Sequence, residues 1–206
     1  MAGPNIPPTV REVGYGLGPL PVVKSAVGDQ IIDFNLFEVI DQPLWDSQTL
    51  ASAQATTLTL FQVPVGQGGK TVVDTNMEIA GQLTNPKNEL VGGISVVANS
   101  DVVLAQLQDL TGTAVLRFKQ ADKNIFILPV HMLGKAMLSG FSGTAAFDFA
   151  GLGDPGVRYG YPLRYPFVIV ASQAFQVEIL FGTALGVITN LKIWVYLHGI
   201  QTRAIK

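Results

Sequence analysis

Residues 58–97 read LTLFQVPVGQGGKTVVDTNMEIAGQLTNPKNELVGGISVV, and this stretch decides the fold class. Two runs typical of β-strands, 57–64 and 90–98, lie at its ends. Between them come a Gly-rich turn at 66–69 and the uncharged element Thr75-Asn76-Met77. Short apolar runs separated by turn residues are typical of a β-sheet protein. No catalytic constellation accompanies them, so we expect a protein that works through its surfaces.

Alternation with a period of two continues along the chain and predicts half-buried strands. The odd positions of 191–198 form an aliphatic face, and apolar residues alternate with polar ones in 175–181 and 116–119. Eight or more such strands, separated by Gly, Pro, Asn and Asp, predict an all-β sandwich or jelly roll with at most short helices in its loops. The other predicted strands are 31–40, 77–82, 124–132, 145–149 and 166–171, and the helical suspects are 43–55 and 99–110.

The composition indicates extensive buried surface. The chain has 206 residues, of which 48% are apolar and 14% charged, and its mean hydropathy is +0.37. Charged or polar residues interrupt every apolar run before it reaches the roughly 20 residues of a membrane-spanning helix. We therefore expect surfaces that are covered by other subunits, because obligate interfaces resemble a divided core. The chain has no cysteine, which excludes disulfides and thiol chemistry.

The first 30 residues differ from the rest. They are rich in Pro and Gly, which suit neither a helix nor a central strand. A disordered tail is the alternative, but spaced apolar side chains give the segment something to bury. We expect an extended inter-subunit arm at 1–30 followed by one domain at 31–206. The candidate contact residues of the arm are Val10, Val13, Tyr15, Leu17, Leu20 and Val22.

Sequence patterns that suggest an enzyme fail on inspection. The run 66–71, GQGGKT, resembles the end of a phosphate-binding loop, but Pro64 stands where its first Gly should be. Gly151, Gly153 and Gly156 fit GxGxxG without the helix that must follow it. The two histidines, His131 and His198, lack any metal-ligand spacing and are expected in the core or at an interface.

Other ligand classes receive no better support. The acidic residues between Asp29 and Asp46 lack the spacing of a calcium loop, and a serine elbow motif is absent. The net charge is −2, with no basic stripe for nucleic acid. The N-terminus lacks the charged and apolar regions of a signal peptide. We expect no enzymatic activity, no cofactor, no metal and no sequence-specific nucleic-acid binding.

Two segments resemble jelly-roll capsid proteins of tailless icosahedral bacteriophages. One runs from 64 to 71 and on through 74–77 and 81–83, and the other is the final strand and tail, 193–203. Together they cover about a third of the chain. The residues that carry the motif are Gly66, Gly69, Lys70, Thr71, Thr75, Asn76, Met77 and Gly81.

The resemblance implies a subunit of a virion capsid, assembled in the host cytoplasm, whose jelly roll stands upright on the shell. The chain is short for a double jelly roll, so a single one is expected. Homo-oligomers such as trimers, pentamers or hexamers are implied, together with a possible second capsid protein and an underlying lipid membrane. The alternative is a β-sandwich that binds carbohydrate or a receptor, with aromatic residues of the 159–165 loop stacking on sugars.

Overall fold

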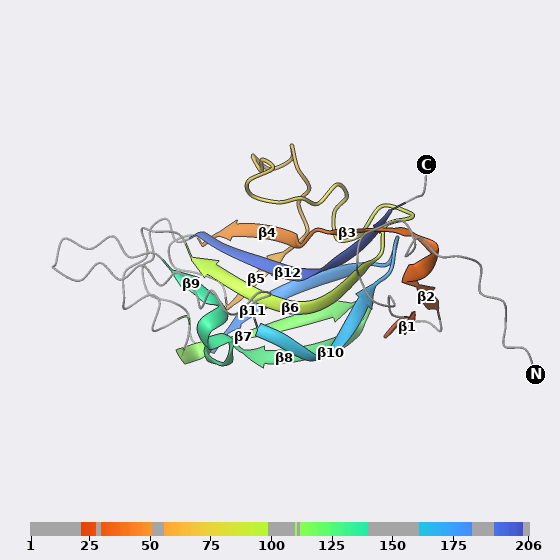
Figure 1. Ribbon diagram of the computed structural model, residues 1–206. Coiled ribbons are helices and arrows are strands. Elements are labelled where there is room, and N and C mark those ends of the chain that lie inside the picture. The colour runs from red at the N-terminus through yellow and green to blue at the C-terminus, as the bar shows by residue number, and fades with distance from the viewer. Residues whose placement is uncertain are drawn as a thin grey trace, which may run out of the picture.

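The protein is all-β: strands from distant parts of the chain build two large sheets, and a separate two-stranded sheet accompanies them. The computed structural model describes residues 22–27, 30–50, 56–98, 110, 112–139 and 161–182, together with 192–203; for 134–139 it gives the backbone only. Figure 1 shows the arrangement. The strands are β1 (Val22–Lys24), β2 (Ile31–Asp33), β3 (Glu38–Asp41), β4 (Leu44–Thr49), β5 (Thr57–Leu60), β6 (Glu89–Ala98), β7 (Ala114–Gln120), β8 (Lys123–Pro129), β9 (Met137–Ser139), β10 (Tyr161–Ile169), β11 (Phe175–Phe181) and β12 (Lys192–Arg203).

The larger sheet has four columns of strands. Its order is β10-β6-β12-β3, and β4 continues the column of β3 because the two pair with successive parts of β12. In the same way, β9 continues the column of β10 along β6. The smaller sheet has the order β5-β11-β7-β8. All of these pairs are antiparallel except β6–β9.

The pairing between strands is nested along the chain. The first column, β3 with β4, pairs with the last strand, β12. The next strand, β5, pairs with β11, and β6 pairs with β10. The innermost pair, β7 and β8, is a hairpin. The chain therefore folds back on itself once as a long double ribbon, and this ribbon forms both sheets.

The two sheets pack face to face on an apolar core. Along β11 and the first half of β12, every second residue is apolar and points inward, as the sequence predicts. Five phenylalanines in or against this core form tilted or stacked pairs, with ring centroids 4.6–6.0 Å apart. The largest fully buried side chains of the core include Phe61, Phe118, Leu44, Leu60, Met77, Ile94, Leu116, Ile169 and Ile179.

A smaller cluster lies on the other face of the larger sheet. Phe34, Val168 and Val170 are buried there, with Val23 and Ile32 packed against them. Val168 alternates along β10 with Phe167 and Ile169 of the main core, so it faces outward. The β1–β2 hairpin and the short 3-10 helix η2 (Phe34–Leu36) therefore cover one end of this sheet.

Several predicted boundaries are wrong. Residues 44–49 of the suspected helix 43–55 form β4, because they pair with β12 over six residues. The predicted strand 31–40 is broken by η2, which begins where the Asp33 carboxylate accepts a hydrogen bond from the Asn35 N–H. Residues 77–82 are not a strand: the chain turns at Gly81, whose φ is +64°. The predicted strand 124–132 ends at Pro129, where the 3-10 helix η3 (Val130–Ala136) begins.

Other predictions fall partly or wholly outside the described residues. Val22 belongs to β1, so the end of the expected arm forms part of the β1–β2 hairpin. The remaining arm residues, the strand at 145–149, the GxGxxG at 151–156 and nearly all of the helix at 99–110 lie outside the described residues. Among the described residues, no helix is long and apolar enough to cross a membrane.

Candidate functional site

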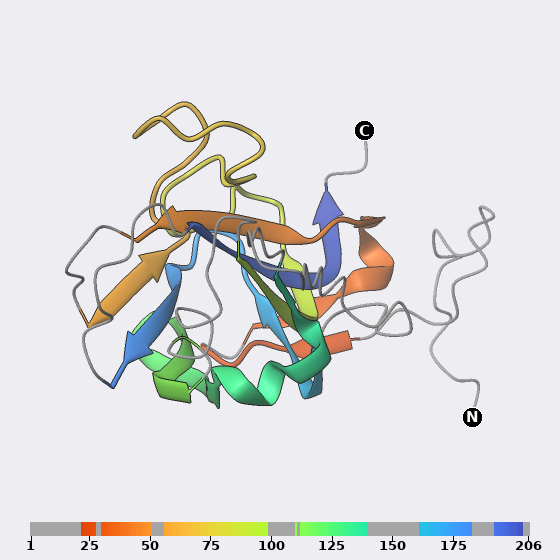
Figure 2. The ribbon, with the colours of Figure 1, turned by 90° about the vertical axis from the view of Figure 1, so that its left-hand side faces the viewer.

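The motif residues of the sequence belong to one loop, 61–88, which runs along the outer edge of β4. Figures 1 and 2 show this loop standing off one side of the sandwich. Asn76 takes the place of a neighbouring strand: its Oδ1 accepts from the Trp45 N–H at 2.9 Å, and its own N–H donates to the Trp45 carbonyl at 3.2 Å. Thr75 forms a bridge with Asp46. The loop therefore covers a sheet edge that would otherwise be open.

Lys70 is a structural counterion. Its Nζ lies 2.6 Å from Oδ1 of Asp46, a fully buried residue of β4, and only 11% of the lysine side chain is exposed. The second carboxylate oxygen of Asp46 accepts the Phe61 N–H at 2.5 Å. The lysine that suggested a phosphate-binding loop points into the protein and is neutralised there. This geometry explains the residue without a nucleotide.

A second ion pair fixes the next part of the loop. Asp74 pairs with Lys192 of β12 and accepts hydrogen bonds from the N–H of Thr71 at 2.8 Å and from its hydroxyl at 2.9 Å. The hydrogen bond from Lys192, followed by that from the Thr71 backbone, holds the pKa of the Asp74 carboxyl well below its usual range. Asp74 therefore stays ionised and closes the turn 71–74 against the sheet.

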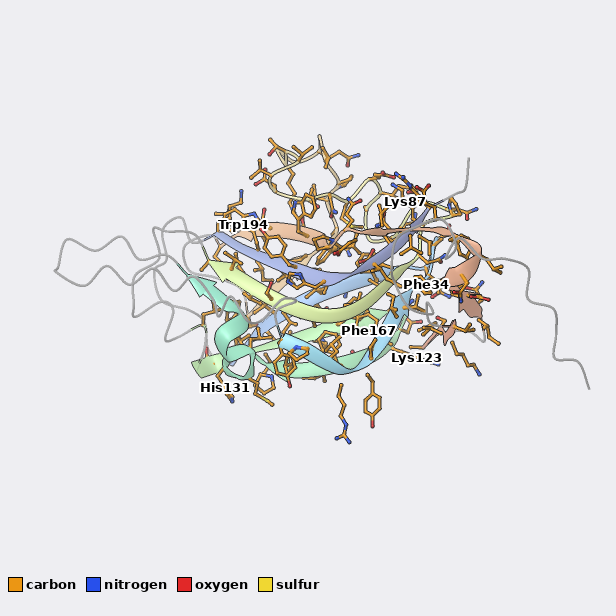
Figure 3. The ribbon with its side chains drawn as sticks, in the orientation of Figure 1. Phe34, Lys87, Lys123, His131, Phe167 and Trp194 are labelled. Carbon is orange, nitrogen blue, oxygen red and sulfur yellow. The ribbon has the colours of Figure 1, made fainter. Side chains whose placement is uncertain are left out.

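This turn carries two exposed valines, which we call the valine knob. Val72 is 67% exposed and Val73 is 70% exposed. The indole N–H of Trp45 donates to the Val72 carbonyl at 3.2 Å, and that of Trp194 donates to the Val73 carbonyl at 3.3 Å. Figure 3 places Trp194 at this side of the molecule. Two tryptophans and an ion pair therefore hold apolar side chains in solvent.

A glycine turn precedes the knob. The N–H of Gly66 donates to the Lys70 carbonyl at 2.9 Å, and the Lys70 N–H donates to the Gln67 carbonyl at 3.0 Å. Gly66 and Gly69 have φ values of +82° and +77°, a conformation that other residues rarely adopt. The glycines of the motif therefore serve the turn that aims Lys70 at Asp46.

An apolar groove lies on the opposite side of the sandwich, between β8 and β10. We call it the β8–β10 groove; it has a volume of about 230 Å³. Phe126 and Phe167, 5.8 Å apart between ring centroids, line it together with Leu163, while the rim includes Ile127 and Tyr165, which are 57% and 77% exposed. Figure 3 labels Phe167 on β10. Among the described residues, Arg164 is the only charged one that lines the groove.

The two histidines lie in different surroundings. His131 is exposed in η3, so of the two expected positions the core is wrong for it, and an interface stays a prediction. His198 is half-buried, and its Nε2 lies 2.7 Å from the hydroxyl of Ser95. Burial lowers the pKa of His198, and the charge of Asp41 partly opposes this. Within the described part of the chain, no group of three His, Asp or Glu side chains is placed to hold a metal ion.

Besides Asp46, a second fully buried carboxyl group was not anticipated from the sequence. Glu89 of β6 is fully buried, and its Oε2 accepts from the Gln201 amide at 3.3 Å. Its Oε1 has no hydrogen-bond partner among the described residues. Burial raises the pKa of Glu89 well above its ordinary value of 4.5, against the hydrogen bond from Gln201. It lies beside a β-bulge where the register of β12 on β6 shifts after His198.

Sequence reasoning found the loop but not the groove. Gly66, Gly69, Lys70, Thr71, Thr75, Asn76, Met77 and Gly81 all lie in the 61–88 segment; Gly69 has the positive φ of its turn, and the others form hydrogen bonds there. The groove combines residues about forty positions apart, and only the exposed Ile127 within an alternating strand could have signalled it. Comparison with protein families and with curated proteins found no match for this chain.

Proposed function

We propose that this protein is a structural subunit of a virus shell: a single jelly-roll domain that self-assembles into an icosahedral capsid and has no enzymatic activity. The nested strand pairing supports the jelly-roll assignment. Jelly rolls have eight strands in two sheets, built from two Greek keys. Counting β3 with β4 as one strand and setting aside β9 and the β1–β2 hairpin leaves eight strands, four in each sheet.

The observation that carries the proposal is the valine knob. A pair of exposed valines on a loose loop would have little meaning, but here two indole N–H groups and a buried-edge ion pair fix them in place. Contact of apolar side chains with water is unfavourable, so exposed apolar patches that are held rigidly mark interaction sites. The β8–β10 groove is a second apolar surface, on the other side of the sandwich.

Two different apolar surfaces suit a subunit that contacts several neighbours. A contact between unlike patches of identical subunits is heterologous, and such contacts generate rings when the rotation closes. Trimers, pentamers or hexamers are the rings from which an icosahedral shell is built. The low charge content, 14% of residues, fits a surface of which much is covered after assembly.

The test uses the purified full-length chain in light scattering over a range of protein and salt concentrations, with negative-stain microscopy of large species. Closed shells or defined rings support the proposal, and a strictly monomeric protein at high concentration contradicts it. Val73→Asp should reduce assembly while leaving the folded domain intact. The matched control is Ile31→Asp, which places the same charge at a similarly exposed apolar position on β2.

A carbohydrate- or receptor-binding sandwich is the second candidate, and one observation favours it. The ring of Tyr165 is exposed, and the guanidinium of Arg164 lies 5.6 Å from its centroid. Exposed aromatic faces bind the apolar faces of sugars. In this case Tyr165→Ala should abolish binding on a glycan array without changing the oligomeric state. A wild-type protein that binds no glycan removes this candidate.

A further inference from the structure

The β8–β10 groove has the properties of a site for an added strand. Among the described residues, β8 pairs only with β7, so within this part of the chain no strand occupies the backbone N–H and C=O groups of its outer edge. On the facing side, the regular pairing of β10 with β6 is interrupted between Pro162 and Phe167. Apolar side chains line the space between these strands. Extended peptides add to such edges through backbone hydrogen bonds, and side-chain pockets select the sequence.

One segment of the chain has the matching pattern. Residues 12–18 read EVGYGLG, in which Val13, Tyr15 and Leu17 alternate with glycines. In an extended chain the three apolar side chains share one face and the glycines share the other. Such a strand can bury one face in an apolar groove while its other face allows close approach by a neighbour. Five residues span about 17 Å, within the roughly 23 Å length of the seven-residue β8.

The charges of the two partners are complementary. Glu12 is the only acidic residue among the first 28 residues. Of the groove-lining residues in the described part of the chain, Arg164 alone is charged, and its side chain is exposed. Glu12 directly precedes the alternating segment, so an added strand would place its carboxylate at one end of the groove. A pair of this kind sets direction and register more than affinity.

The point at which the chain enters the described structure also fits. Val23 packs against Val168 and Val170, so the hairpin holds the start of the described chain beside β10. Pro19 and Pro21 favour an extended spacer of about 3.1 Å per residue. The five steps from Leu17 to Val22 then cover about 16 Å, which is comparable to five residues of β10. A spacer of this length would let the segment reach the groove of its own subunit or of an adjoining one.

We propose that the β8–β10 groove binds residues 12–18 of this chain as an extra strand on β8. The proposal holds whether the segment comes from the same subunit or from a neighbour. It does not depend on capsid assembly, although exchange between subunits would make the segment the inter-subunit arm of the proposed shell. The groove then gives that arm a defined receptor.

The absence of cysteine makes the test direct. The full-length Val13→Cys/Ile127→Cys variant is treated with a short bis-maleimide. The variant keeps Tyr15 and Leu17 as anchors, and the length of the reagent accommodates more than one register of the added strand. The expected result is rapid cross-linking at low protein concentration. Its matched control is Val13→Cys/Val73→Cys, because Val73 is as accessible as Ile127 but lies across the sandwich. Circular dichroism and thermal melting confirm that each variant is folded.

The mass of the product identifies the source of the segment. A cross-link within one chain and a cross-link between two chains both support the proposal. Equal yields for the test pair and the control pair overturn it. Efficient cross-linking of Val73→Cys/Ile127→Cys, without the 13–127 product, also overturns it, because the valine knob of a second copy then fills the groove. Light scattering on the same samples reports assembly separately, so a failure of the capsid proposal is distinguishable.

A charge reversal provides an independent measurement. Glu12→Lys should slow 13–127 cross-linking about twofold to fivefold, the size expected for one exposed ion pair. Adding Arg164→Glu to Glu12→Lys should restore the rate. The proposal predicts no such rescue when Arg117→Glu is used instead, because Arg117 lies outside the groove and pairs with Glu178. Rescue by both substitutions would indicate a general charge effect and contradict the assigned pairing.

Discussion

Replacing Lys70 by methionine tests the structural account of the GGKT motif. Methionine keeps most of the apolar stem of lysine but removes the ammonium group, which lies 2.6 Å from the Asp46 carboxylate. Asp46 is fully buried, and the substitution leaves it with the Phe61 N–H as its remaining strong donor. An ionised carboxylate that loses its buried partner is costly because neither water nor another cation replaces it.

The expected loss can be estimated from burial. Removing one member of a buried pair costs about 3–5 kcal/mol, and the 11% exposure of Lys70 places this case near 3 kcal/mol. For a chain of this size, each kcal/mol lowers Tm by roughly 2–4 °C, so Lys70→Met should lower Tm by roughly 6–12 °C. Lys87 provides the matched control. It pairs with Glu78, but both side chains are substantially exposed, so Lys87→Met should cost at most about 1 kcal/mol.

The assay is urea unfolding followed by tryptophan fluorescence, with thermal melting as a second measurement. The two lysine variants are compared with wild type at one pH and ionic strength. The Asp46→Asn/Lys70→Met double variant should recover a large part of the loss, because no buried charge remains unpaired. A Lys70→Met variant as stable as Lys87→Met would refute the reasoning. The lysine would then have another role, and phosphate binding would need to be measured directly.

Three further changes test other parts of the structure. Glu89→Gln should remove a pH dependence of the folding stability. Because the pKa of Glu89 is raised in the folded state, its contribution to stability is fully present below the ordinary pKa of 4.5 and is lost as the pH rises through the folded-state pKa. In urea unfolding between pH 5 and 8, the stability of the wild type should therefore fall more steeply than that of the variant. Parallel pH profiles would contradict this assignment. Gly199→Ala should destabilise by about 1–3 kcal/mol or more, because the new Cβ would lie 2.0 Å from the Leu90 carbonyl oxygen. Gly92→Ala on the paired strand β6 is the control: nothing lies within 4 Å of the added Cβ, so its free energy of unfolding should change by less than about 1 kcal/mol. Equal melting temperatures for the two alanine variants would contradict this prediction. Val73→Asp should leave Tm within about 2 °C of wild type, because a substitution at an exposed position usually changes stability by less than about 0.5 kcal/mol. In light scattering, its loss of assembly should exceed that of Ile31→Asp.

The sequence predicted the β-sheet class and the buried faces of its best strands. In β11, and in β12 as far as Leu197, aliphatic or aromatic residues alternate with other residues, and the ones that this pattern places inward are buried. Local alternation is enough here because a strand with one apolar face has only one way to bury it. The turn chemistry at 66–69 was also readable, since glycine permits the positive φ that this turn requires.

Boundaries failed where tertiary contacts overrode the local pattern. β4 contains the buried polar residues Asp46 and Ser47, so its alternation is weak, and it became a suspected helix. Its strand conformation is stabilised by pairing with β12, which lies about 150 residues later in the chain. In 77–82 the alternation was present, but hydrogen bonds of Gly81 to Phe61 and Phe175 make the chain turn there instead.

By itself, the sequence determined that strands would form, which of their faces would be apolar, and where glycine would turn the chain, because each of these depends on neighbouring residues alone. Only the tertiary structure decided that Lys70 would neutralise Asp46, that two tryptophans would hold the valine knob in solvent, and that β8 and β10 would enclose an apolar groove. These features join residues that are from about 20 to about 120 positions apart. Their partners are selected by the nested pairing of the sheets, and no local pattern of residues encodes that choice.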